Sequence, residues 1–432
     1  MSQQATTGYK NRWAQLIIGV LCMAMVANLQ YGWTLFVNPM QQAHPEWTKA
    51  AIQLAFTIFI VIETWLVPVE GWLVDKFGPR PVVAGGAVLV GLSWVLDSQL
   101  TSLPMLYFAA AIGGIGTGCV YGTCVGNALK WFPDKRGLAA GLNAAGFGAG
   151  AAVTVIPIAN MIKAKGYEAA FFHFGILQGV TIFVLAMLLV RPIAPTGVKV
   201  AARNLQAKRE LTTGQMLKTP VFWLTYAMFV AVATGGLMAT AQIGPMAKDF
   251  GVDSVMVTMF GATLPLLTMA LAIDNVANGL TRPLCGFISD KIGRENTMLI
   301  VFTGEAVALV GLLHFGHEPM AFMFFAAMVF MCWGEIFSIF PAICADTFGG
   351  KYAAGNSGAL YTAKGTASLI VPLASVLSAG GNWSTVFYLA AGITLAAAIS
   401  AKFILAPYRQ RFIANGNAAV DAEQQQAVKQ AA

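Results

Sequence analysis

The chain has 432 residues, of which 57% are hydrophobic and 10% are charged, and its formal net charge is +7. Soluble globular proteins carry about a quarter charged residues, so the composition excludes an ordinary soluble domain. It predicts an all-α protein that crosses a membrane many times. The positive charge lies in short loops beside apolar stretches, where it sets orientation and does not indicate nucleic-acid binding.

Apolar stretches long enough to cross a bilayer follow one another along the chain. The first begins after a polar N-terminus and is too long to be the core of a signal peptide. All six cysteines fall in apolar stretches, which indicates packing residues and no disulfide framework. We place twelve transmembrane helices at 13–37, 50–73, 81–99, 103–129, 137–160, 169–190, 220–244, 265–289, 297–314, 320–343, 354–378 and 384–406.

The longest internal polar stretch, 191–219, separates two sets of six spans. We therefore expect an N-terminal six-helix bundle at 1–190, a cytoplasmic linker loop at 191–219, a C-terminal six-helix bundle at 220–406 and a cytoplasmic tail at 407–432. Residues 254–264 fit this scheme poorly. They either lengthen the eighth helix or form an external turn.

Basic residues orient the protein. Of the 26 Lys and Arg residues, two (Arg282 and Lys364) fall deep within spans, and 20 fall in segments that are cytoplasmic if both termini are inside, counting Lys402 at the inner end of the last span. Only four are external under that topology, and these are Lys49, Lys163, Lys165 and Lys248. Cytoplasmic loops are enriched in Lys and Arg, so we expect both termini inside and a multi-pass protein of the cytoplasmic membrane.

A pattern of ten residues in the first half recurs as nine residues in the second half. The stretch Gly71-Trp72-Leu73-Val74-Asp75-Lys76-Phe77-Gly78-Pro79-Arg80 reappears, 215 positions later, as Gly286-Phe287-Ile288-Ser289-Asp290-Lys291-Ile292-Gly293-Arg294. Glycine allows close helix packing, and the aspartate can accept hydrogen bonds from a helix N-terminus. The repeat predicts two pseudo-symmetric six-helix bundles around a central cavity. It resembles the signature of the major facilitator superfamily. We expect it to stabilise one conformational state through Gly71, Asp75, Arg80, Gly286, Asp290 and Arg294.

Further motifs narrow the resemblance. The stretch Lys130-Trp131-Phe132-Pro133-Asp134-Lys135-Arg136-Gly137-Leu138-Ala139-Ala140-Gly141 is similar to the hallmark of the oxalate:formate antiporter family, as are residues 28–35, 77–80 and 363–368. The resemblance implies that oxalate enters as a dianion and formate leaves as a monoanion. It also implies that the family's essential basic pair corresponds to Arg282 and Lys364.

Arg282 and Lys364 also stand out on physical grounds. Both lie in apolar spans, about 12–15 Å from the inner face, and a charge at that depth costs at least a few kcal/mol. Such residues normally face a polar cavity, so the two cations predict an anion site, plausibly for an anion with two carboxylates. The alternative for Arg282 is a structural ion pair with Asp274 or Glu335.

Buried acids and aromatic rings complete the predicted site. Burial favours the neutral form of a carboxyl group, which makes Glu335 and Glu63 candidates for proton or charge coupling. Both acids replace small or polar residues of the family's oxalate carrier. Core packing is the alternative role for each ring. With the two cations, we expect the substrate to be lined by Gln53, Tyr31, Tyr121, Trp333 and Tyr361.

The leading functional prediction is a monomeric secondary transporter that exchanges oxalate for formate by alternating access. The alternative is a proton-coupled symporter of monocarboxylates such as formate, lactate or pyruvate. The spacing of His, Cys and acidic residues indicates no metal site, and no set of nucleophile and base suggests an enzyme. We expect no cofactor and no nucleic-acid partner.

Overall fold

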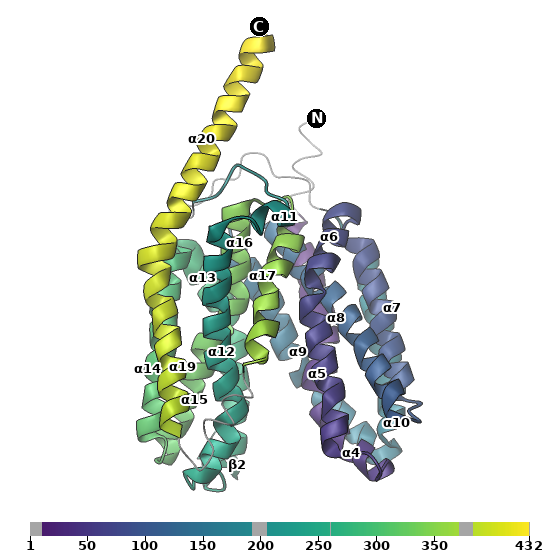
Figure 1. Cartoon of the computed structure of the whole chain (residues 1–432). Coiled ribbons are helices and arrows are strands. Elements are labelled where there is room, and N and C mark those ends of the chain that lie inside the picture. The colour runs from purple at the N-terminus through teal and green to yellow at the C-terminus, as the bar shows by residue number, and fades with distance from the viewer. Residues whose placement is uncertain (1–10, 192–204, 260, 371–382, 432) are drawn as a thin grey trace. The chain divides into compact units, whose positions relative to one another are not determined.

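The computed structural model describes residues 11–191, 205–259, 261–370 and 383–431 (Figure 1). Within those ranges the chain is helical apart from one two-stranded sheet. It forms two compact units. Unit 1 contains Met1–Lys199 and Gly350–Thr362, and unit 2 contains Val200–Gly349 and Ala363–Ala432. The chain therefore enters unit 1 a second time, far from its N-terminus.

Unit 1 is built from α2 to α10. The first predicted span is broken at Ala27 and Gly32 into three helices, and the second is bent by 44° next to Leu66. Pro68, in the first turn after the bend, lacks a backbone N–H and favours a new helix start there. The helices are α2 (Arg12–Val26), α3 (Asn28–Tyr31), α4 (Thr34–Ala43), α5 (Lys49–Trp65), α6 (Val67–Phe77), α7 (Pro79–Asp97), α8 (Leu103–Trp131), α9 (Arg136–Lys165) and α10 (Tyr167–Met187).

Unit 2 contains most of the remaining elements. The tenth predicted span is broken at Glu335, and the last continues through a π-helical turn, η2 (Ala401–Leu405), into the long tail helix (Figure 1). The elements are α11 (Thr213–Met216), α12 (Pro220–Asp249), β1 (Met256–Met259), β2 (Ala262–Pro265), α13 (Leu266–Ile292), α14 (Arg294–Phe315), α15 (Pro319–Gly334), α16 (Ile336–Phe348), α19 (Trp383–Ser400) and α20 (Ala406–Ala431).

Helix α17 (Ala353–Ser368) is divided between the units after Thr362. It covers the first part of the eleventh predicted span, 354–378, whose residues 371–378 lie outside the described part of the chain.

The stretch that the sequence left open is an antiparallel hairpin. Strands β1 and β2 pair Met256 with Pro265 and Met259 with Ala262, and the side chains of Thr258 and Thr263 are 2.8 Å apart. Gly261 has φ +80°, which suits glycine in a tight turn. A turn rather than a longer helix therefore precedes α13.

Among the residues that the structure describes, eight helices are long and apolar enough to cross a membrane by length and composition, or nine if the bent pair α5–α6 is one span. Three predicted spans, represented by α9, α13 and α17, fall short of that simple test. Helix α9 is rich in glycine and alanine, α13 carries Asp274 and Arg282, and only 16 residues of α17 form its helix. Two of these three helices carry the predicted cations.

Candidate functional site

Helix α13 presents a buried polar stripe. Asp274, Asn278 and Arg282 are spaced four residues apart, so they share one face, and all three are buried. The Arg282 guanidinium donates to Asn278 Oδ1 at 2.7 Å, and Asn278 Nδ2 donates to the carbonyl of Phe330 at 3.0 Å. Asn278 therefore fixes the arginine and ties it to α15. Asn278 was not predicted as a site residue, although its position one turn before Arg282 was a usable signal.

The two predicted cations both lie close to one aromatic ring, that of Phe337. Arg282 Cζ lies 4.6 Å from the centre of the Phe337 ring, and Lys364 Nζ lies 5.7 Å from it. Arg282 and Lys364 are 3% and 7% exposed. The ring face attracts cations, which offsets part of the cost of burying two positive charges together. The structure therefore brings Arg282 and Lys364, from α13 and α17, into one positive cluster in unit 2.

The acids predicted as ion-pair partners do not hold the arginine through hydrogen bonds. Both carboxyl oxygens of Asp274 and of Glu335 lack a hydrogen-bond partner among the described residues. Asp274 lies two helical turns, about 12 Å along the axis, from Arg282. Glu335 is fully buried at the break between α15 and α16, where its backbone carbonyl accepts from the Ser338 hydroxyl at 2.8 Å. The Asn278 amide hydrogen-bonds Arg282, which neither of these two acids does.

The predicted aromatic residues fall into two groups. In unit 1, Tyr121 stacks on Tyr361 with ring centres 4.7 Å apart, and Tyr31 and Tyr121 both pack edge-on against Phe147. The Tyr361 hydroxyl donates to Glu63 Oε1 at 3.5 Å. These contacts join three of the predicted tyrosines with one of the predicted acids.

Trp333 belongs to the other group, since its ring packs edge-on against Phe337 in unit 2 at 5.7 Å. Gln53 is part of α5, but its side chain lies outside what the structure describes. Tyr361 and Lys364 are three residues apart on α17 and therefore share a face of that helix.

The first motif copy contacts the beginning of α17. Asp75 Oδ1 accepts from Lys130 Nζ at 2.5 Å, and Oδ2 accepts from the backbone N–H of Gly355 at 3.0 Å. A Cβ placed on Gly71 would lie 2.5 Å from the carbonyl oxygen of Ala354, so only glycine allows this approach. Asp75 thus stabilises the positive end of a helix, as the sequence predicts.

Arg80 plays a different part. It is exposed, and its Nε donates to the carbonyl of Leu189 at 3.3 Å. The basic partner of Asp75 is instead Lys130, which begins the separate motif at 130–141.

The second copy forms a buried network inside unit 2. Arg294 is 1% exposed and contacts Asp290 at 2.6 Å, Asp346 at 3.0 Å and the Ser289 hydroxyl at 2.6 Å. Asp346 also accepts from Gln206 Nε2 at 2.8 Å. Gly286 is buried on α13, the helix that also carries Ser289 and Asp290. Asp346 was not predicted, because the corresponding region of the first half carries Lys130, which has the opposite charge.

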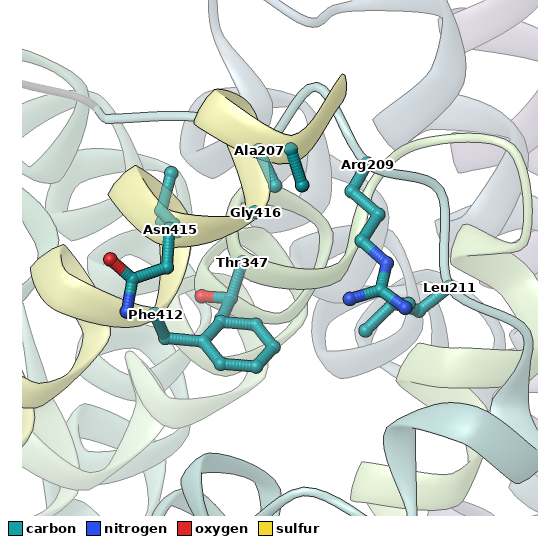
Figure 2. Close-up of a pocket in the computed structure, with 9 residues that line it drawn as sticks. Ala207, Arg209, Leu211, Thr347, Phe412, Asn415 and Gly416 are labelled. Atoms are coloured by element: carbon teal, nitrogen blue, oxygen red, sulfur yellow. The ribbon is translucent and has the colours of Figure 1, made fainter. Parts of the chain in front are cut away.

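A separate cavity of about 190 Å³ lies beside the tail helix in unit 2 (Figure 2). Phe412 and Asn415 come from α20, Thr347 comes from the end of α16, and Arg209 and Leu211 come from the segment before α11. None of the predicted substrate-binding residues lines it.

Comparison with known proteins identifies the family. A family model described as Major Facilitator Superfamily matches residues 16–273 and 254–427. The chain belongs to the major facilitator superfamily. The oxalate:formate antiporter of Oxalobacter formigenes is 36% identical over 407 residues, which cover 93% of each chain.

Solved structures of superfamily transporters share the fold. The proton:xylose symporter XylE matches with a TM-score of 0.67 at 16% identity, covering 91% of this chain and 96% of its own. FucP in the outward conformation matches with a TM-score of 0.66 at 15% identity, covering 92% of this chain and 99% of its own. The predicted fold class, that of a multi-pass helical transporter with the major facilitator fold, is confirmed.

Proposed function

We propose that this superfamily member exchanges small carboxylates across the membrane by alternating access, taking up oxalate and releasing formate. The observation that carries the proposal is the positive cluster of Arg282 and Lys364 around Phe337. The similarity to an oxalate:formate antiporter over 93% of the chain supports the choice of substrate.

The cluster explains why exchange would be coupled. Two buried cations without an anion are costly to enclose, whereas a bound dianion neutralises both. The carrier then reorients readily only when loaded, which makes transport an exchange. Because a divalent anion is exchanged for a monovalent one, each cycle moves net charge across the membrane.

Each residue has a role in this proposal. Arg282 grips a carboxylate with its planar guanidinium, Lys364 supplies the second charge, and Asn278 positions Arg282. Tyr31, Tyr121, Trp333, Tyr361 and Gln53 line the substrate path. The two motif copies stabilise one conformational state through the contacts of Asp75 and Asp290.

The wider arrangement is part of the same proposal. The carrier is a monomer in the lipid bilayer of the cytoplasmic membrane, with both termini in the cytoplasm, as the distribution of Lys and Arg favours. Its halves are 1–190 and 220–406, joined by the linker 191–219 and followed by the tail 407–432.

A second candidate is a proton-coupled monocarboxylate symporter. The full burial of Glu335 and of Glu63 favours it, since a buried acid that can exchange a proton is a common coupling device. The two candidates differ in driving force. Exchange persists with a protonophore and responds to membrane potential, whereas symport requires an inward proton gradient.

The test is radiolabelled oxalate uptake into formate-loaded proteoliposomes. We expect Arg282→Gln and Lys364→Gln each to lower exchange at least about tenfold, because a charged hydrogen-bonding partner contributes about 1.5–3 kcal/mol. Arg411→Gln, on the exposed face of α20, is the matched control and should exchange normally. Normal exchange in both site variants would exclude the proposed site.

A further inference from the structure

The cavity beside α20 contains a charge that the exchange mechanism does not use. Its volume is about 190 Å³, and a protein cavity of about 150 Å³ can hold a benzene molecule, so a small organic molecule fits. Among the described residues that line it, only Arg209 is charged. Most of the others are apolar, including Leu211 and Phe412. The cavity therefore combines one cation with an apolar surface.

The Arg209 guanidinium is available to a ligand. It forms no hydrogen bond and no ion pair with any residue that the structure describes, and it is exposed. The adjacent acid, Glu210, does not line the cavity, and its Oε2 lies against Gly349. The positive charge of Arg209 is therefore not neutralised by its neighbour in the chain.

The backbone on both sides of Arg209 is held in place. The N–H of Ala207 donates to the carbonyl of Asp346 at 2.9 Å, and the N–H of Leu211 donates to the carbonyl of Phe348 at 2.9 Å. Both carbonyls lie at the end of α16, so the segment that carries Arg209 is fixed to that helix. In Figure 2 the Arg209 guanidinium and the Phe412 ring lie on different sides of the cavity. A cation on a fixed segment loses less freedom when it binds a ligand.

Gly416 leaves this cavity open. It lies inside α20 and has no positive φ, so no turn requires a glycine there. Among the described residues, a Cβ on Gly416 would meet only the Arg209 side chain, whose Cβ and Cδ would be 3.9 Å away, an ordinary contact. Close packing does not require glycine either, and glycine is a poor helix former. What the glycine provides is space, because it lines the cavity next to Arg209.

We propose that this cavity is a binding site for a small organic anion with one carboxylate and an apolar body. The carboxylate pairs with the Arg209 guanidinium, which matches its planar geometry. The apolar body lies against Phe412 and Leu211. A single cation and an apolar wall favour such a ligand over a compact dianion. The site shares no residue with the positive cluster of Arg282 and Lys364, so the inference does not depend on the proposed function.

The experiment uses benzoate as the probe. Radiolabelled benzoate is dialysed against the full-length protein in nanodiscs, with empty nanodiscs as the blank and excess oxalate present to occupy a carboxylate transport site. We expect one saturable site per chain. Arg209→Gln should raise the Kd at least about tenfold, because it removes a charged hydrogen-bonding partner. Arg411→Gln, exposed on α20 and outside the cavity lining, is the control and should bind normally.

A second variant separates loss of the site from loss of folding. Gly416→Leu fills the cavity with a branched side chain and replaces a poor helix former by a good one. We expect it to lose benzoate binding while its unfolding temperature stays the same or rises. Ala418→Leu, exposed on the same helix and outside the cavity lining, should keep wild-type binding.

Three results would overturn the inference. These are no saturable benzoate binding by the wild type, an unchanged Kd in Arg209→Gln, or full binding in folded Gly416→Leu. Benzamide, the neutral analogue, should bind the wild type at least about tenfold more weakly than benzoate, and equal binding would show that the charge of Arg209 plays no part. That comparison needs no variant, so it decides the matter even if a variant does not fold. Oxalate exchange in proteoliposomes would stand in every case.

Discussion

The two copies of the repeated motif have nearly the same sequence but bind different partners. In unit 1, Asp75 pairs with Lys130 and with the backbone N–H of Gly355. Gly355 belongs to Gly350–Thr362, the later segment of the chain that is part of unit 1. In unit 2, Asp290 and Asp346 both bind the buried Arg294 guanidinium. One copy therefore holds a helix start, whereas the other holds a buried guanidinium between two carboxylates.

This difference suggests a division of labour. A bond from a carboxylate to a backbone N–H at a helix N-terminus is a single contact, which can form and break during a transport cycle. A guanidinium enclosed by two carboxylates and a hydroxyl is costly to open, because each charge would lose its partner in a buried environment. Both copies stabilise one conformational state, but the first is better suited to switching and the second also stabilises unit 2 itself.

The largest expected effect is on the second copy. Asp346→Asn removes a charge that faces the fully buried Arg294, and breaking such a buried pair costs about 3–5 kcal/mol. We expect a marked fall in the thermal unfolding temperature in detergent. Asp134→Asn, which breaks the partly exposed pair with Arg12 at 2.8 Å, is the control and should change it much less. Equal shifts in the two variants would contradict a special role for the buried network.

The next effect is on the first copy. Gly71→Ala places a methyl group 2.5–2.6 Å from the backbone of Ala354 and Gly355, so the start of α17 must move. Overpacking of this kind costs about 1–3 kcal/mol. We expect slower oxalate exchange, because the contact belongs to a switch, and a smaller fall in the unfolding temperature than in Asp346→Asn. Gly85→Ala, where a Cβ would meet nothing within 4 Å, should exchange normally. Exchange at the wild-type rate in Gly71→Ala would show that the close approach is dispensable.

The fold class and the two cations were predictable because each depends on a strong local signal. Long apolar stretches and a repeat at half the chain length predict the two bundles, and a charge within a span is rare enough to be noticed. The contact of Gly71 and Asp75 with another helix followed from the chemistry of glycine and of helix ends.

The residues that were missed depend on tertiary contacts. Asn278 is an ordinary amide until the structure places it between Arg282 and the carbonyl of Phe330. The region of the first half that corresponds to Asp346 carries a lysine, so the repeat did not predict an acidic residue there. The exact breaks at Leu66 and Glu335 were not predicted either, although Pro68 and Gly334 stand beside them.

The smallest expected effect concerns the exposed contacts between α20 and the segment before α11. Asn417 on α20 accepts from the Lys208 N–H at 2.7 Å and donates to the Gln206 carbonyl at 3.3 Å, and Lys208 Nζ pairs with Asp421 at 2.7 Å. The ion pair is about half exposed, so water screens it and it contributes at most about 1 kcal/mol. Asp421→Asn should leave the unfolding temperature and exchange almost unchanged, whereas Asn417→Ala, which loses two backbone contacts, should lower the unfolding temperature more. If Asp421→Asn were as damaging as Asp346→Asn, burial would not be what distinguishes the strong contacts of unit 2 from the weak ones.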